Sequence, residues 1–200
     1  MLLAVDTSGA TSVALVDDDG SLLAAASSDD PRAHAESIGP LLAQMLEGVD
    51  RTAITGVAYG VGPGPYTGLR VGMAAARAAA FALGVPGLPV LSHDAVALAA
   101  VEGGAALPLV VVADAKRRER FATVYRALDA AGLPVRDGEP SVGPEADLPD
   151  LPRAEGAVEA ASIGRAAALR VSAGLPLEAP DARYLRSPDV TLSTPKRVLG

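Results

Sequence analysis

Asp6, Thr7 and Ser8 form an acidic, hydroxyl-bearing turn directly after a short apolar run, residues 2–5. An aspartate at a strand end beside hydroxyl groups has the donors and acceptors to position a phosphate or a metal-bound water. The same residue types also form structural turns in which the carboxylate accepts hydrogen bonds from its own turn. Asp114 stands at the end of a second apolar run, so two such turns would be able to face each other across a cleft. On these residues alone, a nucleotide or phosphate turn and a purely structural turn both stay open.

The most glycine-rich stretch, residues 60–72, lies between an apolar run and a long alanine-rich segment. This pattern predicts a strand, a tight turn and a helix. A turn with so little side-chain bulk lets a ligand or another backbone approach the main chain closely. A P-loop requires lysine and a hydroxyl residue after its last glycine, but Leu69 and Arg70 follow Gly68. We therefore reject a P-loop.

The two histidines have no spacing that favours a metal site. His34 and His93 belong to no His-x-x-x-His or Glu-x-x-His pattern. His93, which Asp94 follows, is expected to cap a helix or to lie on the surface. The sequence contains no Gly-x-Ser-x-Gly elbow and no cysteine, which excludes disulfides, thiolate metal sites and a cysteine nucleophile.

Charge and composition argue against a protein that binds nucleic acid through its overall charge and against a membrane-spanning protein. The formal net charge of −7 argues against binding nucleic acid through the overall field, and residues 116–118 form the one basic run. The long apolar segment 71–90 carries Arg77 near its middle and glycines and prolines at its end, unlike a membrane-spanning helix. The first residues lack the pattern of a secretory signal. We expect a cytoplasmic protein with no membrane contact.

Hydrophobic periodicity predicts the elements that position these residues. Expected strands cover residues 2–5, 11–16, 21–26, 54–59, 89–91, 107–115 and 121–127. Expected helices cover residues 35–46, 67–83, 94–101 and 162–172. Much of the segment 130–180 has only weak periodicity.

The unit of strand, aspartate, turn and partner strand occurs twice along the chain, first at Asp6 and again at Asp114. Such a repeat indicates a duplicated fold. We predict an N-terminal lobe over residues 1–104 and a shortened, less regular C-terminal lobe over residues 105–200.

The helix expected over residues 67–83 has one face nearly free of side chains and is apolar on its other faces apart from two arginines. One side of such a helix should press on the sheet and the other on a second surface. That second surface is either a neighbouring helix of the same chain or another subunit, and both interpretations stay open. The apolar stripe of the helix at residues 35–46 would belong to the same surface. The residues assigned to this interface are His34, Ile38, Leu41, Leu42, Met45, Thr67, Gly68, Gly72, Ala75, Ala76 and Ala79.

Residues 62–72, GPGPYTGLRVG, resemble the signature GPGSFTGLRIG of the TsaB (YeaZ-type) proteins, with Pro65 and Tyr66 in place of serine and phenylalanine. Further matching segments lie at residues 3–8, 32–34, 58–60, 112–115 and 184–186. The segment 118–183 matches least. On these motifs the chain is identified as a member of this family.

The resemblance implies an α/β fold of the actin/Hsp70/sugar-kinase (ASKHA) type with two similar lobes. It implies a non-catalytic, accessory role in making threonylcarbamoyladenosine (t6A) beside the anticodon of tRNAs that read ANN codons. The implied partners are a TsaD-type threonylcarbamoyltransferase, a TsaE-type ATPase, tRNA indirectly, and a second copy of the chain when it is alone. No cofactor is assigned, and ATP or ADP at the complex interface stays open.

TsaD-like proteins carry a His-x-x-x-His metal pair after the strand that follows the glycine-turn helix. Ser92 and Val96 stand at those positions here, so the resemblance implies neither a metal ion nor a catalytic residue. Two alternatives remain: an ATP-dependent small-molecule kinase of the same fold, with Asp6 and Asp114 around the nucleotide, and a glycoprotease-like metalloenzyme. If the smooth helix face binds a partner, Gly72→Arg or Ala76→Arg should abolish the complex and leave the monomer folded.

Overall fold

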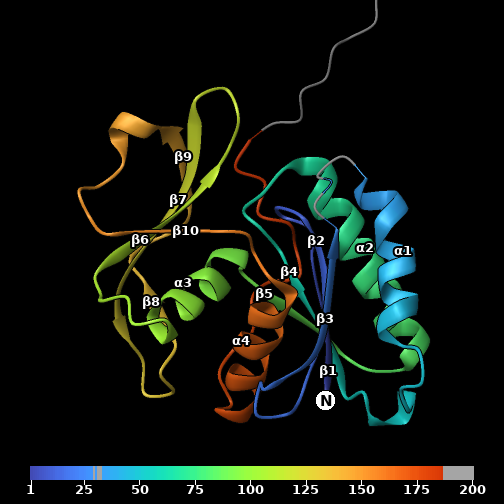
Figure 1. The fold of residues 1–200 in the computed structure, drawn as a ribbon. Helices are drawn as coiled ribbons and strands as arrows, with labels where there is room; N and C mark the ends of the chain where they lie inside the picture. The colour runs from blue at the N-terminus through green and yellow to red at the C-terminus, as the bar shows by residue number, and fades with distance from the viewer. Residues whose placement is uncertain (29, 31–32, 187–200) are drawn as a thin grey trace, which may run out of the picture.

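The computed structural model describes residues 1–28, 30 and 33–186. Two sheets stand side by side, with helices packed against them (Figure 1). Arg32, which belongs to one motif of the resemblance, lies outside the described residues, as does the end of the expected C-terminal lobe after residue 186. Within the described part of the chain, no helix is both long enough and apolar enough to cross a membrane.

The first sheet has five strands in the order β3-β2-β1-β4-β5. β1 pairs with β2 in antiparallel and with β4 in parallel orientation, and β3 and β5 form the two edges. The strands are β1 (Leu2–Asp6), β2 (Thr11–Val16), β3 (Leu22–Ser28), β4 (Gly56–Gly60) and β5 (Gly87–Val90). Every residue of β1, β2 and β4 is buried, because helices cover both faces of the sheet.

Three helices pack on the first sheet, α1 (His34–Met45), α2 (Tyr66–Leu83) and α4 (Ala160–Ser172), whereas α3 (Ser92–Glu102) packs against α4 and the second sheet. Figure 1 shows α1 and α2 on one side of the sheet and α4 on the other. Successive side chains of β1 point to opposite faces of the sheet, so they belong to two different parts of the core. Leu3 and Val5 pack with the residues of α1 and α2, whereas Leu2 and Ala4 pack with those of α4. A short 3-10 helix, η1 (Arg51–Ala53), precedes β4.

The second sheet has the order β10-β6-β7-β8, with β9 also paired to β7. Its strands are β6 (Leu109–Asp114), β7 (Glu119–Leu128), β8 (Pro134–Arg136), β9 (Ser141–Pro144) and β10 (Arg153–Glu155), and η2 (Glu145–Asp147) is a 3-10 helix. β6 repeats the arrangement of β1, since it pairs antiparallel with the next strand and parallel with a later one. Asp6 and Asp114 each occupy the last pair of their hairpin.

Each expected helix and strand is present, with ends shifted by a few residues. β8, β9 and β10 were not predicted, because they are short and lie in the segment 130–180, whose periodicity is weak. α4 comes from the expected C-terminal lobe but packs on β1, β2 and β4 of the first sheet. The division of the chain at residues 104/105 stays a prediction.

Candidate functional site

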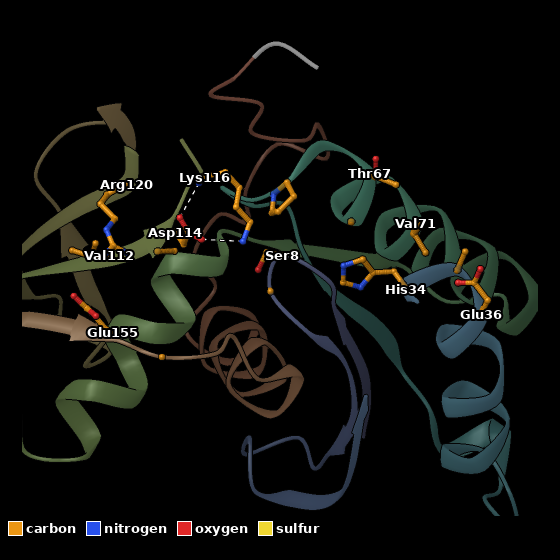
Figure 2. Close-up of a pocket in the computed structure, with 16 residues that line it drawn as sticks. Ser8, His34, Glu36, Thr67, Val71, Val112, Asp114, Lys116, Arg120 and Glu155 are labelled. Carbon is orange, nitrogen blue, oxygen red and sulfur yellow. Dashed lines mark hydrogen bonds and ion pairs between the residues drawn. The ribbon is translucent and has the colours of Figure 1, made fainter. Parts of the chain in front are cut away.

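Both aspartate turns border one cleft of about 810 Å³ between the two sheets. Ser8 and Gly9 line it from the first turn, and Asp114 and Lys116 line it from the second (Figure 2). The first turn of α2 adds Thr67 and neighbouring residues to the wall.

The Asp6 carboxylate is enclosed by the protein behind this wall, with only 1% of the residue exposed. Its Oδ1 accepts hydrogen bonds from the Ser8 backbone N–H at 2.7 Å and the Ser8 hydroxyl at 2.6 Å. Its Oδ2 accepts one from the Ser92 hydroxyl at 2.8 Å. Burial raises the pKa of Asp6 to about 6, although these hydrogen bonds favour the charged form. The carboxylate is therefore bound within its own turn and to the start of α3.

The glycines of the sequence motif make room for this turn. A Cβ at Gly60 would overlap Asp6 Oδ2, and one at Gly72 would overlap the hydroxyl of Thr7. Thr7 Oγ1 donates a hydrogen bond to the carbonyl of Gly68 at 2.7 Å. The bare face of α2 therefore packs on the β1–β2 turn of the same chain.

The second turn is open to solvent. Asp114 is exposed, and it accepts hydrogen bonds from the Lys116 backbone N–H at 2.8 Å and Lys116 Nζ at 2.9 Å. These hydrogen bonds lower the pKa of Asp114. Lys116, Arg117 and Arg118 have φ angles of 63°, 53° and 64°, a left-handed run that costs about 1–2 kcal/mol per residue. The two turns therefore share topology but differ in burial and charge.

The cleft wall carries charges of both signs. Lys116 and Arg120 line it together with Glu36, Asp114 and Glu155. Lys116 is paired with Asp114 at 2.9 Å. Within the described residues, this wall offers no concentrated positive patch for a phosphate.

The two histidines lie in different surroundings. His34 lines the cleft, and its Nδ1 lies 2.8 Å from Thr11 Oγ1. Burial lowers the pKa of His34, which keeps the ring neutral near pH 7. His93 is 1% exposed, its Nδ1 lies 2.8 Å from Thr123 Oγ1, and burial lowers its pKa to about 3. The expected capping or surface role of His93 is wrong, because α3 begins two residues earlier than predicted and carries the ring into the core.

Sequence reasoning missed a buried ionic cluster at Asp94. Its carboxylate accepts hydrogen bonds from Tyr125 Oη at 2.7 Å and Arg170 Nη2 at 2.9 Å, and Arg136 Nε lies 3.5 Å away. Arg136 also pairs with Glu178. Burial raises the pKa of Asp94, while the two arginines oppose the shift. These residues come from four separate elements and a following loop, so no local spacing links them.

The predicted interface residues occupy three kinds of position. His34, Ile38, Met45, Gly68, Gly72 and Ala76 are buried, Leu41, Leu42, Ala75 and Ala79 are half-buried, and Thr67 is exposed. The outward face of α2 carries the exposed Arg70 and Arg77 together with Ala74, Ala78 and Phe81, of which Phe81 is 90% exposed. Ala74, Ala78 and Phe81 follow the i, i+4, i+7 spacing of one helix face.

The positions that correspond to a histidine pair hold no metal ligand. The Ser92 hydroxyl donates a hydrogen bond to Asp6 Oδ2 and also accepts one from the Gly62 N–H at 3.2 Å. Val96 packs against the apolar core. The described residues contain no group of three or more histidine, cysteine or acidic side chains placed to hold a metal ion.

The chain is similar in sequence to a known protein family and to several known proteins. Residues 28–135 match the model of the family described as TsaD: tRNA N6-adenosine threonylcarbamoyltransferase. An uncharacterized protein of Mycobacterium tuberculosis is 42% identical over 122 residues, which are 60% of this chain and 52% of the relative. The Haemophilus influenzae tRNA threonylcarbamoyladenosine biosynthesis protein TsaB is 35% identical over 92 residues, 45% of this chain and 39% of the relative.

Among solved structures, YeaZ from Pseudomonas aeruginosa is similar with a TM-score of 0.74 and 26% identity, over 92% of this chain and 99% of that one. The matched part of this chain spans about half the length, or less, of these two curated relatives.

Proposed function

We propose an accessory role in t6A synthesis for this chain, which belongs to the tRNA N6-adenosine threonylcarbamoyltransferase family. Within that family it is of the TsaB (YeaZ) type. The expected ASKHA-type α/β fold is confirmed by the likeness to YeaZ. The activity itself, its tRNA substrates and its partners are inferred from relatives that the chain matches only in part.

The main support for this proposal is the outward face of α2. Ala74 and Ala78 leave the helix backbone accessible, and Phe81 projects beyond them with 90% of its surface exposed. An exposed aromatic beside small residues is typical of a surface that another subunit covers. The half-buried Leu41 and Leu42 of α1 would extend it. The partner we propose is a TsaD-type transferase that presents a helical layer of its own.

The same surface accounts for the other proposed partners. Without the transferase, an isologous contact through α2 would bury Phe81 in a homodimer. A TsaE-type ATPase and tRNA would join through the assembled complex, with ATP or ADP at its interface.

Two observations favour an accessory over a catalytic role. Ser92 and Val96 are both used in packing and hydrogen bonding within the chain. The kinase alternative needs carboxylates on both sides of the cleft, but the Asp6 carboxylate is bound to Ser8 and Ser92 behind the cleft wall. Turnover of ATP with a small acceptor by the isolated protein would favour the kinase instead.

The test is depletion of the protein, followed by nucleoside analysis of tRNA and rescue with variants. Depletion should lower t6A, and the unchanged chain should restore it. Ala78→Arg and Phe81→Glu should each weaken binding to the TsaD-type partner at least about tenfold and fail to rescue, because the first puts a long side chain where the helix surface is small and the second removes the exposed aromatic ring. Ala173→Arg, at an exposed alanine after α4, is the matched control and should rescue. Unchanged t6A on depletion would refute the role, and full rescue by both variants would refute this surface.

A further inference from the structure

β3 is an edge strand whose pairing with β2 is regular from Ala24 to Ser28 and shifts register once, at Leu23. It pairs with β2 on one side only, and its seven residues, Leu22–Ser28, include no charged residue and no proline. Leu22 and Leu23 are 57% and 51% exposed. Such an edge presents unpaired backbone N–H and C=O groups to any extended chain that reaches it.

The other sheet edges in the described part of the chain are protected. β5 contains Pro89, whose carbonyl accepts a hydrogen bond from the Glu178 N–H at 3.2 Å. β8 and β10 have three residues each and carry charges, Arg136 in β8 and Arg153 and Glu155 in β10, while β9 has four residues and ends in Pro144. Short length, charge and proline are the features by which edges avoid pairing with other chains. The open edge of β3 is therefore specific to this strand.

A groove of about 390 Å³ runs beside β3. β3 contributes Leu22, Ala25, Ala26 and Ser27 to its wall, and the segment 157–161 forms part of the opposite side. The small side chains leave space for every second side chain of an added strand.

Acidic residues lie at both ends of this edge. Residues 17–19 are three exposed aspartates before β3, and Asp30 and Glu159 are exposed near its end. Asp18 is paired with the N-terminal amine at 2.9 Å, and Arg165 lies near Asp19. Two copies that paired through β3 about a two-fold axis would place the acidic start of one strand against the acidic end of the other. Like charges placed opposite each other in this way disfavour a second copy.

We propose that β3 binds an extended segment of another protein, with small or β-branched residues at its centre and lysine or arginine at both ends. Main-chain hydrogen bonds would add this segment to the first sheet as a sixth strand beside the five present. The basic ends would pair with the acids that bracket the edge. This site is separate from the outward face of α2 and goes beyond the role in t6A synthesis.

The test measures binding of a fluorescent, end-blocked peptide of alternating threonine and valine bracketed by lysines. A peptide with the same centre and glutamate ends is its control. The intact protein should bind the lysine peptide at least about tenfold more tightly, and added salt should reduce the difference. Leu23→Lys should weaken binding at least about tenfold, because it places a charge on the edge. Leu128→Lys, at a 45% exposed leucine of β7, should bind like the unchanged protein.

A charge-reversed variant separates binding from folding, because it should gain affinity for the other peptide, which an unfolded protein would not do. Asp30→Lys combined with Glu159→Lys should shift the preference toward the glutamate peptide. Failure of both peptides to bind, or equal binding to both, would overturn the proposal. A concentration-dependent dimer that Leu23→Lys abolishes would also overturn it and assign the edge to a second copy. Neither result bears on t6A, which the depletion experiment measures separately.

Discussion

Gly60 and Gly72 are glycines because other side chains already fill the space that a Cβ would need. Asp6 occupies that space at Gly60, and Thr7 occupies it at Gly72. Gly39 in α1 is different, since apart from its chain neighbours, which include Pro40, nothing lies within 4 Å of the position of its Cβ. The two helical glycines, Gly72 and Gly39, therefore allow a comparison of a position packed against a distant residue with one that is not.

We expect Gly72→Ala to lower the free energy of unfolding by about 1–3 kcal/mol, because the methyl group must displace Thr7. Gly39→Ala should change it by less than about 1 kcal/mol, because the better helix propensity of alanine is offset by the contact of its Cβ with the ring of the following Pro40. Urea unfolding followed by circular dichroism measures both changes. Equal stability of the two variants would contradict the packing described here.

The same contact corrects an expectation about partner binding. Gly72→Arg was expected to leave the monomer folded, but Gly72 faces Thr7 in the core and an arginine there would disrupt the fold. Ala76 is likewise fully buried. The exposed Ala78 is the residue at which an arginine tests the partner surface alone.

At the scale of elements, the Asp94 cluster joins α3 to β7, β8 and α4. Tyr125, Arg136 and Arg170 supply its partners from these three elements. A buried ion pair adds little net stability, but removing one partner leaves the other charges buried without compensation. The cluster therefore fixes how these elements sit against one another.

Asp94→Ala should lower the free energy of unfolding by about 3–5 kcal/mol. Asp137→Ala removes an exposed carboxylate that pairs with Arg126 and should cost about 0–1 kcal/mol. Chemical denaturation of both variants gives the comparison. A loss at Asp94 no larger than that at Asp137 would show that the cluster does not join these elements.

At the scale of the whole molecule, residues 160–186 lie against both sheets. α4 covers one face of the first sheet, and the segment after it bonds to both sheets. The Arg183 N–H donates to the Val61 carbonyl, and the Arg186 guanidinium donates to the Ala115 carbonyl. The first sheet therefore depends on residues that follow the second one.

A fragment of residues 1–104 should fail to unfold cooperatively, because it lacks α4 and leaves Leu2, Ala4 and Val16 exposed to water. Co-expression with residues 105–200 should restore a cooperative transition, measured by thermal circular dichroism. A sharp transition in the fragment alone would instead support an independent N-terminal lobe.

The sequence by itself determined the long elements, the repeat and the family. β2 was predicted at its observed ends and α2 to within one residue, because their patterns repeat within a few positions. The motif at residues 62–72 identified the family for a related reason, since order and spacing are properties of the chain alone. β8, β9 and β10 lie in the segment of weak periodicity and were not found in this way.

Only the tertiary structure decided which way the key side chains face. Thr7 meets Gly68 across 61 positions of sequence, and His93 meets Thr123 across 30. A helix that is apolar on nearly all sides carries no signal for its orientation, so the inward direction of Gly72 followed only from its contact with Thr7. Contacts between distant segments also enclosed Asp6 behind the cleft and left Phe81 on the surface, where we propose that a partner binds.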